Sequence, residues 1–303
     1  MLYLICCILV GCSVSMIFRY AEGNGHNGNN IMFVNYIMST ASAAVMAALD
    51  GVWGNLGSVS ESQPFSLFSE KIVPNTILIL IIIGVFSGVY YMSSLVFIRH
   101  SYFSNGVATT LMFSKSCFII PTFAALVLWG EFPKGLQLAG AMFCVIAIAI
   151  MLLRTGDGRK ISNLPILILT LLICGMMQVN SKLFTRYCIN DYSNMFLTFL
   201  YATACLVSLG LNLYENGRKG EKLHITPKEW GFGLIAGACN FGSNWLQLRA
   251  LQVFPAGLVF PCLAAGNLVI GSVLGWLLFK ERLSRKQVFA LSMTCVGLVL
   301  ANL

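Results

Sequence analysis

The sequence contains little charge. Only 10% of its 303 residues are Asp, Glu, Lys or Arg, whereas 57% are hydrophobic. A water-soluble domain usually carries about 25% charged residues, so the composition excludes an ordinary soluble protein. The net charge of +8 does not indicate a nucleic-acid partner, because the basic residues lie in short loops between apolar runs, where they orient a chain in a membrane.

Histidine and catalytic groupings are scarce as well. The three histidines, His26, His100 and His224, lie in predicted loops or at predicted helix ends. The eleven cysteines lie mostly inside apolar runs without the spacing of metal ligands, and we interpret them as small buried hydrophobes. The sequence also lacks paired acids at a helix boundary and a serine beside a base. It therefore predicts no metal, no cofactor and no enzyme activity.

Long apolar runs dominate what is present. Residues 77–98 contain no charge, and about 20 such residues cross a bilayer. The run at 2–18 has no positively charged stretch before it and is predicted as a first span, not a signal peptide. The ten predicted spans lie near 2–18, 31–49, 76–98, 105–128, 136–153, 164–184, 193–213, 231–252, 256–279 and 287–303. This pattern predicts an all-α, multi-pass protein of the cell membrane, plasma or inner.

Two junctions between apolar runs repeat each other, "LWGEFPKGLQLAGAM" from Leu128 and "LLFKERLSRKQVFAL" from Leu277. Three sets of residues share the repeat: Glu131 with Glu281 and Gln137 with Gln287 at an offset of 150, Gly84-x-x-x-Gly88 with Gly233-x-x-x-Gly237 at 149, and Gly11 with Gly175 at 164. We therefore predict two five-helix repeats, 1–153 and 164–303, joined by a loop at 154–163. Because five is odd, the second repeat starts on the opposite side of the membrane, so the repeats are inverted, as in many secondary transporters.

The repeated glutamates have two interpretations. A Glu beside a helix N-terminus is favoured by the helix dipole, so Glu131 and Glu281 can be structural caps and hinge anchors. Pro121 and Gly271, each ten residues earlier, can loosen their helices at matching depths. The alternative is a direct role of the two glutamates in transport.

The five-plus-five layout, the Glu and Gln of each junction and the segment "RALQVFPAGLVFPCLAAGNLVIGSVLGWLLFKERLS" at 249–284 resemble the drug/metabolite transporter superfamily, in its EamA-like branch. The resemblance covers nearly the whole chain. It implies a carrier of small metabolites with its site between two bundles. Because members of the superfamily handle amino acids, sugars, nucleotide sugars or drugs, the resemblance does not select a substrate.

Lys115 is the one charge predicted deep inside a span. A charged residue in the membrane is a candidate site by default, although this Lys could instead bind backbone carbonyls. Small multidrug members of the superfamily use an embedded carboxylate for lipophilic cations, and no Asp or Glu lies in the middle of a predicted span here. A buried Lys therefore favours an anionic or zwitterionic substrate. Its counterpart in the second half is Ala265, beside Asn267, another candidate.

A polar stripe marks the eighth span. Asn240, Asn244 and Gln247 share one helical face. A polar stripe on a span points inward, either to bind substrate or to hydrogen-bond another helix. At the offset of 150 its counterparts are Tyr90 and Ser94, and the glycine offset of 149 would shift each by one. Weaker candidates are Asn180, Gln178, Asn35 and Tyr36.

These features predict a secondary-active transporter of a small polar metabolite, an amino acid or another anionic or zwitterionic molecule, working by alternating access. The alternatives are a sugar or nucleotide-sugar carrier and a membrane assembly subunit that transports nothing. The expected partners are a small-molecule substrate and the lipid bilayer, with a homodimer left open.

The basic residues also predict a topology. Lys115 aside, five of the 19 Lys and Arg flank the second, fourth, sixth and eighth connections (Lys71, Lys134, Lys182, Arg186 and Arg249), and the remaining 13 flank the other five. Basic residues concentrate on the cytoplasmic side, which places both termini outside. The family resemblance implies the reverse, with both termini in the cytoplasm.

Overall fold

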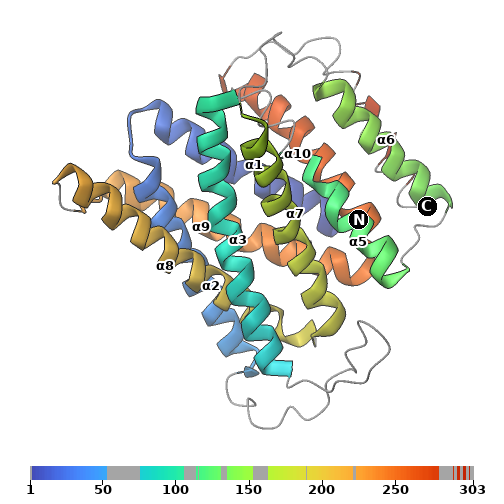
Figure 1. The fold of residues 1–303 in the computed structure, drawn as a ribbon, viewed down its shortest axis with the longest axis horizontal. Helices are drawn as coiled ribbons and strands as arrows, with labels where there is room; N and C mark the ends of the chain where they lie inside the picture. The colour runs from blue at the N-terminus through green and yellow to red at the C-terminus, as the bar shows by residue number, and fades with distance from the viewer. Residues whose placement is uncertain are drawn as a thin grey trace. The chain divides into compact units, whose positions relative to one another are not determined.

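The computed structural model describes residues 2–52, 76–105, 114, 116–130, 135–152, 163–188, 190–220, 223–279, 289, 292–293, 296–297 and 300. Every element within these residues is helical (Figure 1). The elements are α1 (Leu2–Gly23), α2 (Gly28–Leu49), α3 (Thr76–Asn105), η2 (Ser116–Phe118), α5 (Ile119–Trp129), α6 (Gly135–Leu152), α7 (Leu164–Tyr187), η3 (Asn190–Tyr192), α8 (Ser193–Lys219), α9 (Pro227–Val253) and α10 (Ala256–Phe279).

Several helices have the length and surface of membrane spans. Five stretches are long and apolar enough to cross a bilayer: Leu2–Gly23, Gly28–Leu49, Ile79–Ile98, Leu164–Tyr187 and Ser193–Arg218. Large apolar side chains are exposed along these and other helices, for example Leu49 at 77% and Leu206 at 69%. Lipid accommodates such a surface, whereas water would penalise it.

The predicted fourth span, 105–128, differs from the helices observed. α3 continues to Asn105, and the chain resumes as the short 3₁₀ helix η2 followed by α5. Pro121 lies in the first turn of α5, where a missing N–H breaks no intrahelical bond. Gly130 ends α5 with a φ of 61°, a left-handed conformation that favours glycine. Lys115 lies outside the described residues.

The chain divides into two compact units. One consists of residues 1–12, 93–182 and 249–303, and the other of residues 13–92 and 183–248. The division passes through α1, α3, α7 and α9. Each unit therefore contains segments from both halves of the sequence. It is a different division from the repeats predicted at 1–153 and 164–303, which stay a prediction.

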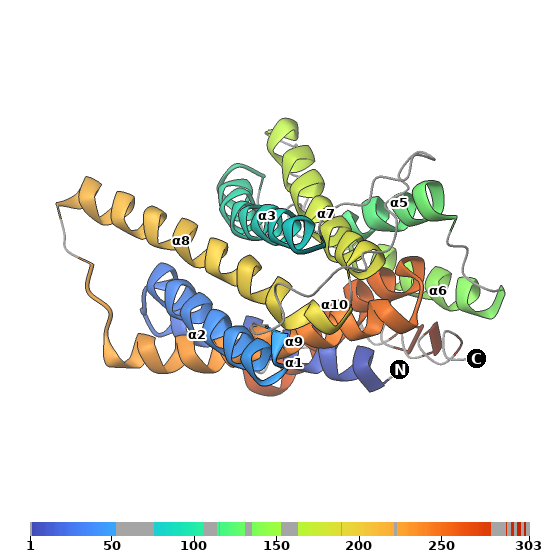
Figure 2. The ribbon, with the colours of Figure 1, turned by 90° about the horizontal axis from the view of Figure 1, so that it is seen from below.

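In the first unit, α10 packs against α5 and α6 (Figure 2). Gly266 on α10 meets Ile8 of α1, and Gly175 on α7 meets Ile120 of α5; a Cβ added at Gly175 would lie 2.7 Å from the Ile120 Cβ. Close packing around small residues is typical of membrane helix interfaces.

In the second unit, α2 and α8 lie side by side (Figure 1). Phe184 and Phe196 stack with ring centroids 4.4 Å apart, and Tyr36 and Tyr201 are almost completely buried. Aromatic side chains therefore contribute much of the core of this unit.

The start of α9 is held by a capping box. Glu229 N–H donates to Thr226 Oγ1 (3.4 Å), and Thr226 N–H donates to Glu229 Oε2 (2.8 Å). The same carboxylate accepts from Asn27 N–H at 2.8 Å and from Asn30 Nδ2 at 3.1 Å. Glu229 therefore ties α9 to the turn between α1 and α2.

Glu229 lies just before the predicted span 231–252. Burial of its carboxyl would raise its pKa, but the hydrogen bonds from Thr226, Asn27 and Asn30 favour the charged form more strongly, so the pKa lies below its ordinary value.

Candidate functional site

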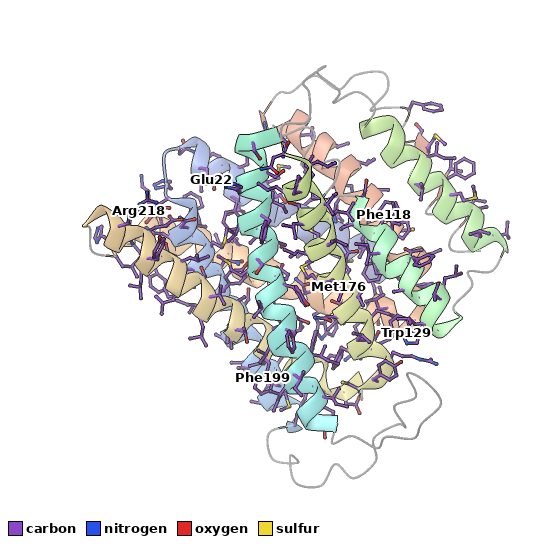
Figure 3. All side chains as sticks on the ribbon, in the orientation of Figure 1. Glu22, Phe118, Trp129, Met176, Phe199 and Arg218 are labelled. Atoms are coloured by element: carbon purple, nitrogen blue, oxygen red, sulfur yellow. The ribbon has the colours of Figure 1, made fainter. Side chains whose placement is uncertain are left out.

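Four helices of the second unit approach each other closely at glycines. Gly84 and Gly88 on α3 meet α8, and Gly233 and Gly237 on α9 meet α2. A Cβ added at Gly84 would lie 2.8 Å from the Cβ of Phe199, which is labelled in Figure 3. No side chain larger than hydrogen fits without a shift at these positions, so the two glycine pairs determine how closely the helices pack.

These contacts follow the internal repeat. On the α3 side, Gly84 meets Phe196 O and Phe199, and Gly88 meets Leu200 O and Thr203; on the α9 side, Gly233 meets Ile31 O and Val34, and Gly237 meets Asn35 O and Met38. Each glycine on α9 lies 149 residues after its counterpart on α3, and each partner on α8 lies 165 residues after its counterpart on α2. The third helix of each repeat therefore packs on the second helix of the other.

The ends of α2 and α8 are joined in the same paired way. Asn29 Nδ2 donates to Glu215 Oε2 at 2.5 Å, and Asn194 Nδ2 donates to Asp50 Oδ2 at 2.6 Å. Both the two asparagines and the two carboxylates are 165 residues apart. We call these two pairs the terminal clamps.

The terminal clamps define the symmetry of the second unit. The start of α2 contacts the end of α8, and the start of α8 contacts the end of α2, so the two helices run antiparallel. An operation that exchanges them reverses the direction of the chain. In these four helices, repeat-equivalent segments are therefore related by an approximate two-fold axis.

Residues beside this axis contact their own counterparts. Tyr36 and Tyr201, 165 residues apart, have ring centroids 6.5 Å apart. Tyr91 and Asn240, 149 residues apart, are joined by a hydrogen bond of 2.8 Å from the Tyr91 hydroxyl to Asn240 Oδ1. A residue can touch its own equivalent only near the axis. These four residues, with Asn35 and Asn244, form what we call the axial cluster.

Asn240 is the centre of the axial cluster. Its Nδ2 donates to Asn35 Oδ1 at 3.4 Å, and its backbone carbonyl accepts from the Tyr201 hydroxyl at 3.0 Å. Asn244 Nδ2 lies within hydrogen-bond distance of Asn240 Oδ1 (3.1 Å) and of the Tyr91 hydroxyl (3.4 Å). Because these interactions cross four helices, they fix the helices relative to one another.

The chemistry of the axial cluster is neutral. Amides and phenol hydroxyls both donate and accept hydrogen bonds, and the Tyr91 ring lies edge-on to those of Tyr36 and Tyr201. The cluster can therefore exchange its internal hydrogen bonds for those of a polar ligand. It contains no group that would carry charge at neutral pH.

The structure brings together two residues of the predicted stripe, Asn240 and Asn244. Gln247 and Tyr90 are half-buried, and the hydrogen bond to Asn240 comes from Tyr91. The glycine offset of 149 identifies Tyr91, whereas the junction offset of 150 points to its neighbour. Tyr201 was not among the predicted candidates, although its relation to Tyr36 by the repeat could have indicated it.

Other predicted residues lie in the first unit. Ser94 is buried, and Asn267 Oδ1 accepts from Cys12 Sγ at 3.5 Å. Asn180 is buried, and its Nδ2 has no hydrogen-bond partner among the described residues. Gly271 lies within α10. Glu131 and Glu281 lie outside the described residues.

Comparison with known proteins agrees with this architecture. Residues 164–303 match the EamA-like transporter family, which is part of the drug/metabolite transporter superfamily. The predicted second repeat therefore belongs to that family. The family and the apolar helices identify the chain as an integral membrane protein, and members of the family are transporters.

A solved structure titled "Crystal structure of protein" is similar over nearly the full length. The TM-score is 0.67 at 14% identity, covering 99% of this chain and 95% of that chain. At that identity the similarity shows the fold alone. No curated protein matches the sequence.

Proposed function

We propose that this protein is a secondary transporter that moves a small polar metabolite across the cell membrane by alternating access. The observation that carries the proposal is the pair of terminal clamps, one at each end of the antiparallel helices α2 and α8. Two similar halves of opposite orientation can exchange conformations, opening one site to each side in turn.

The terminal clamps suggest how the exchange works. Opening one end of the α2–α8 pair breaks the clamp there and leaves the other intact. Because the clamps are equivalent by the repeat, the two open conformations are similar in energy. A transporter needs this balance, since a large difference would trap it in one state.

The axial cluster, on the symmetry axis between the two clamps, is the proposed region of substrate contact. Its amides and hydroxyls suit the polar groups of a metabolite, and the predicted Lys115 would favour an anionic or zwitterionic one. The neutral chemistry of the cluster favours one alternative, a sugar carrier, because amides and aromatic rings can bind the hydroxyls and the apolar face of a sugar ring.

A flux assay tests the transport proposal. Purified protein in liposomes would be given radiolabelled amino acids, sugars and nucleotide sugars separately. Uptake of at least one, absent from empty liposomes, supports a carrier. If no metabolite moves although the protein is folded, the alternative of an assembly subunit replaces the proposal.

Cysteine cross-linking tests the role of the terminal clamps. In a cysteine-depleted background, Asn29→Cys with Glu215→Cys, or Asp50→Cys with Asn194→Cys, would be joined by a short cleavable linker. Either linkage should stop flux, and cleavage should restore it, whereas the single-cysteine variants treated alike should remain active. Undiminished flux with both ends joined would show that the clamps do not open during transport.

A further inference from the structure

Lys182 is a cation buried within a helix. It lies in α7, in a stretch long and apolar enough to cross a membrane, and it is only 5% exposed. Arg186, one turn further along, is exposed. A Lys near a helix end usually extends its ammonium to the interface, and Lys182 does not. The sequence placed this residue with the basic flanks of a loop, so its burial is a correction.

Lys182 shares one face of α7 with Gly175 and Gln178, since residues three and four apart are neighbours on a helix. Gly175 meets Ile120 of α5. Gln178 Nε2 donates to Cys117 Sγ of η2 at 3.3 Å. This face therefore packs on η2 and α5, and Lys182 continues it by one turn.

Gln178 supplies a second polar group on the same face. Its Oε1 is buried and has no hydrogen-bond partner among the described residues. A buried acceptor without a donor is costly and calls for an explanation. The face thus presents a cation and an acceptor that lacks a donor, one turn apart.

We propose that Lys182 and Gln178 bind the zwitterionic head of an α-amino acid. The ligand's carboxylate pairs with the Lys182 ammonium, and its ammonium donates to Gln178 Oε1. A ligand that is only an anion would leave Oε1 without a donor, and a neutral sugar would leave the Lys without an anion. This assignment rests on the proposed transport function and deepens it by naming the substrate class.

Binding is tested first on the purified wild-type protein. Each common L-amino acid is added at millimolar concentration, and thermal unfolding is followed, because a ligand of the native state raises apparent stability. The ligand giving the largest shift is then compared with its carboxamide and with the corresponding acid that lacks the amino group. We expect both analogues to bind at least about tenfold more weakly, since each loses a charge-assisted hydrogen bond.

Variants then locate the site. Lys182→Met and Gln178→Leu should each raise the Kd of the amino acid about tenfold or more. Lys182→Arg keeps the charge and should retain part of the affinity. Arg186→Met, the matched control on the next turn, should leave the affinity unchanged. If Lys182→Met does not fold, Gln178→Leu and Lys182→Arg decide.

The outcomes separate this inference from the transport proposal. Equal affinity in wild type, Lys182→Met and Gln178→Leu would overturn the inference. So would liposomes that take up a sugar or nucleotide sugar and neither bind nor move an amino acid, and transport would then stand. Amino-acid binding that depends on Lys182, with no flux of any metabolite, would support the site and refute the transporter.

Discussion

Replacing Asn240 with Leu tests the axial cluster most directly. The Asn240 side chain accepts from the Tyr91 hydroxyl at 2.8 Å and from Asn244 Nδ2 at 3.1 Å, and it donates to Asn35 Oδ1 at 3.4 Å. Hydrogen bonds inside membrane proteins average about 0.6 kcal/mol, so three together contribute about 2 kcal/mol. Leu has a similar volume, and the variant should therefore lose about that much unfolding free energy.

Detergent-driven unfolding in mixed micelles would measure this loss, with Gln247→Leu on the same helix as the control outside the cluster. Tyr91→Phe removes only the hydroxyl. In a double-mutant cycle, Asn240→Leu and Tyr91→Phe should show a coupling of about 0.6–1.7 kcal/mol. Strict additivity of the two losses would mean that their hydrogen bond contributes nothing, and the axial cluster would lose its central interaction.

Three further predictions concern packing, topology and the repeated junction. Gly88→Ala and Gly237→Ala should each cost about 1–3 kcal/mol of unfolding free energy by overpacking, while Gly210→Ala, where an added Cβ meets nothing within 4 Å, should cost nothing; equal effects at all three would contradict the close approach. Gly217→Cys, in a cysteine-depleted background on intact cells, should resist an impermeant thiol reagent if both termini lie outside, and labelling would reverse the topology. Glu281→Gln should lower expression and folding more than substrate affinity, and a folded but inactive variant would point to a coupling role.

The register of the repeat could largely be predicted from the sequence. The match of Gly84-x-x-x-Gly88 with Gly233-x-x-x-Gly237 corresponds to equivalent contacts in the structure. The offset of 165 between α2 and α8 could not be read, because few residues are shared between these helices. It emerges only when Asn29 and Asn194 are seen to make the same contact from opposite ends.

Burial of single polar residues was harder to predict. Lys182 has a loop-flanking position in the sequence, and only the packing of its helix face shows that it is buried. The start of α5 was also missed, since the apolar run through 105–128 gives no sign of the 3₁₀ turn at η2. Hydropathy reports how apolar a segment is, not which neighbours cover each residue.

The lowered pKa of Glu229 has a consequence for stability. A carboxyl whose pKa is lower in the folded than in the unfolded state stabilises the fold above its unfolded pKa, about 4.3 for Glu, and this contribution disappears as the pH falls through the folded value. Other carboxylates titrate in the same range, so wild type must be compared with Glu229→Gln. The variant loses the charge-assisted bonds from Thr226, Asn27 and Asn30, and its melting temperature in detergent should be lower at pH 7. As the pH falls below about 4.3, the gap between the two proteins should narrow. A gap that stays constant from pH 7 through the acid range would show that the charge of Glu229 does not hold α9 to the α1–α2 turn.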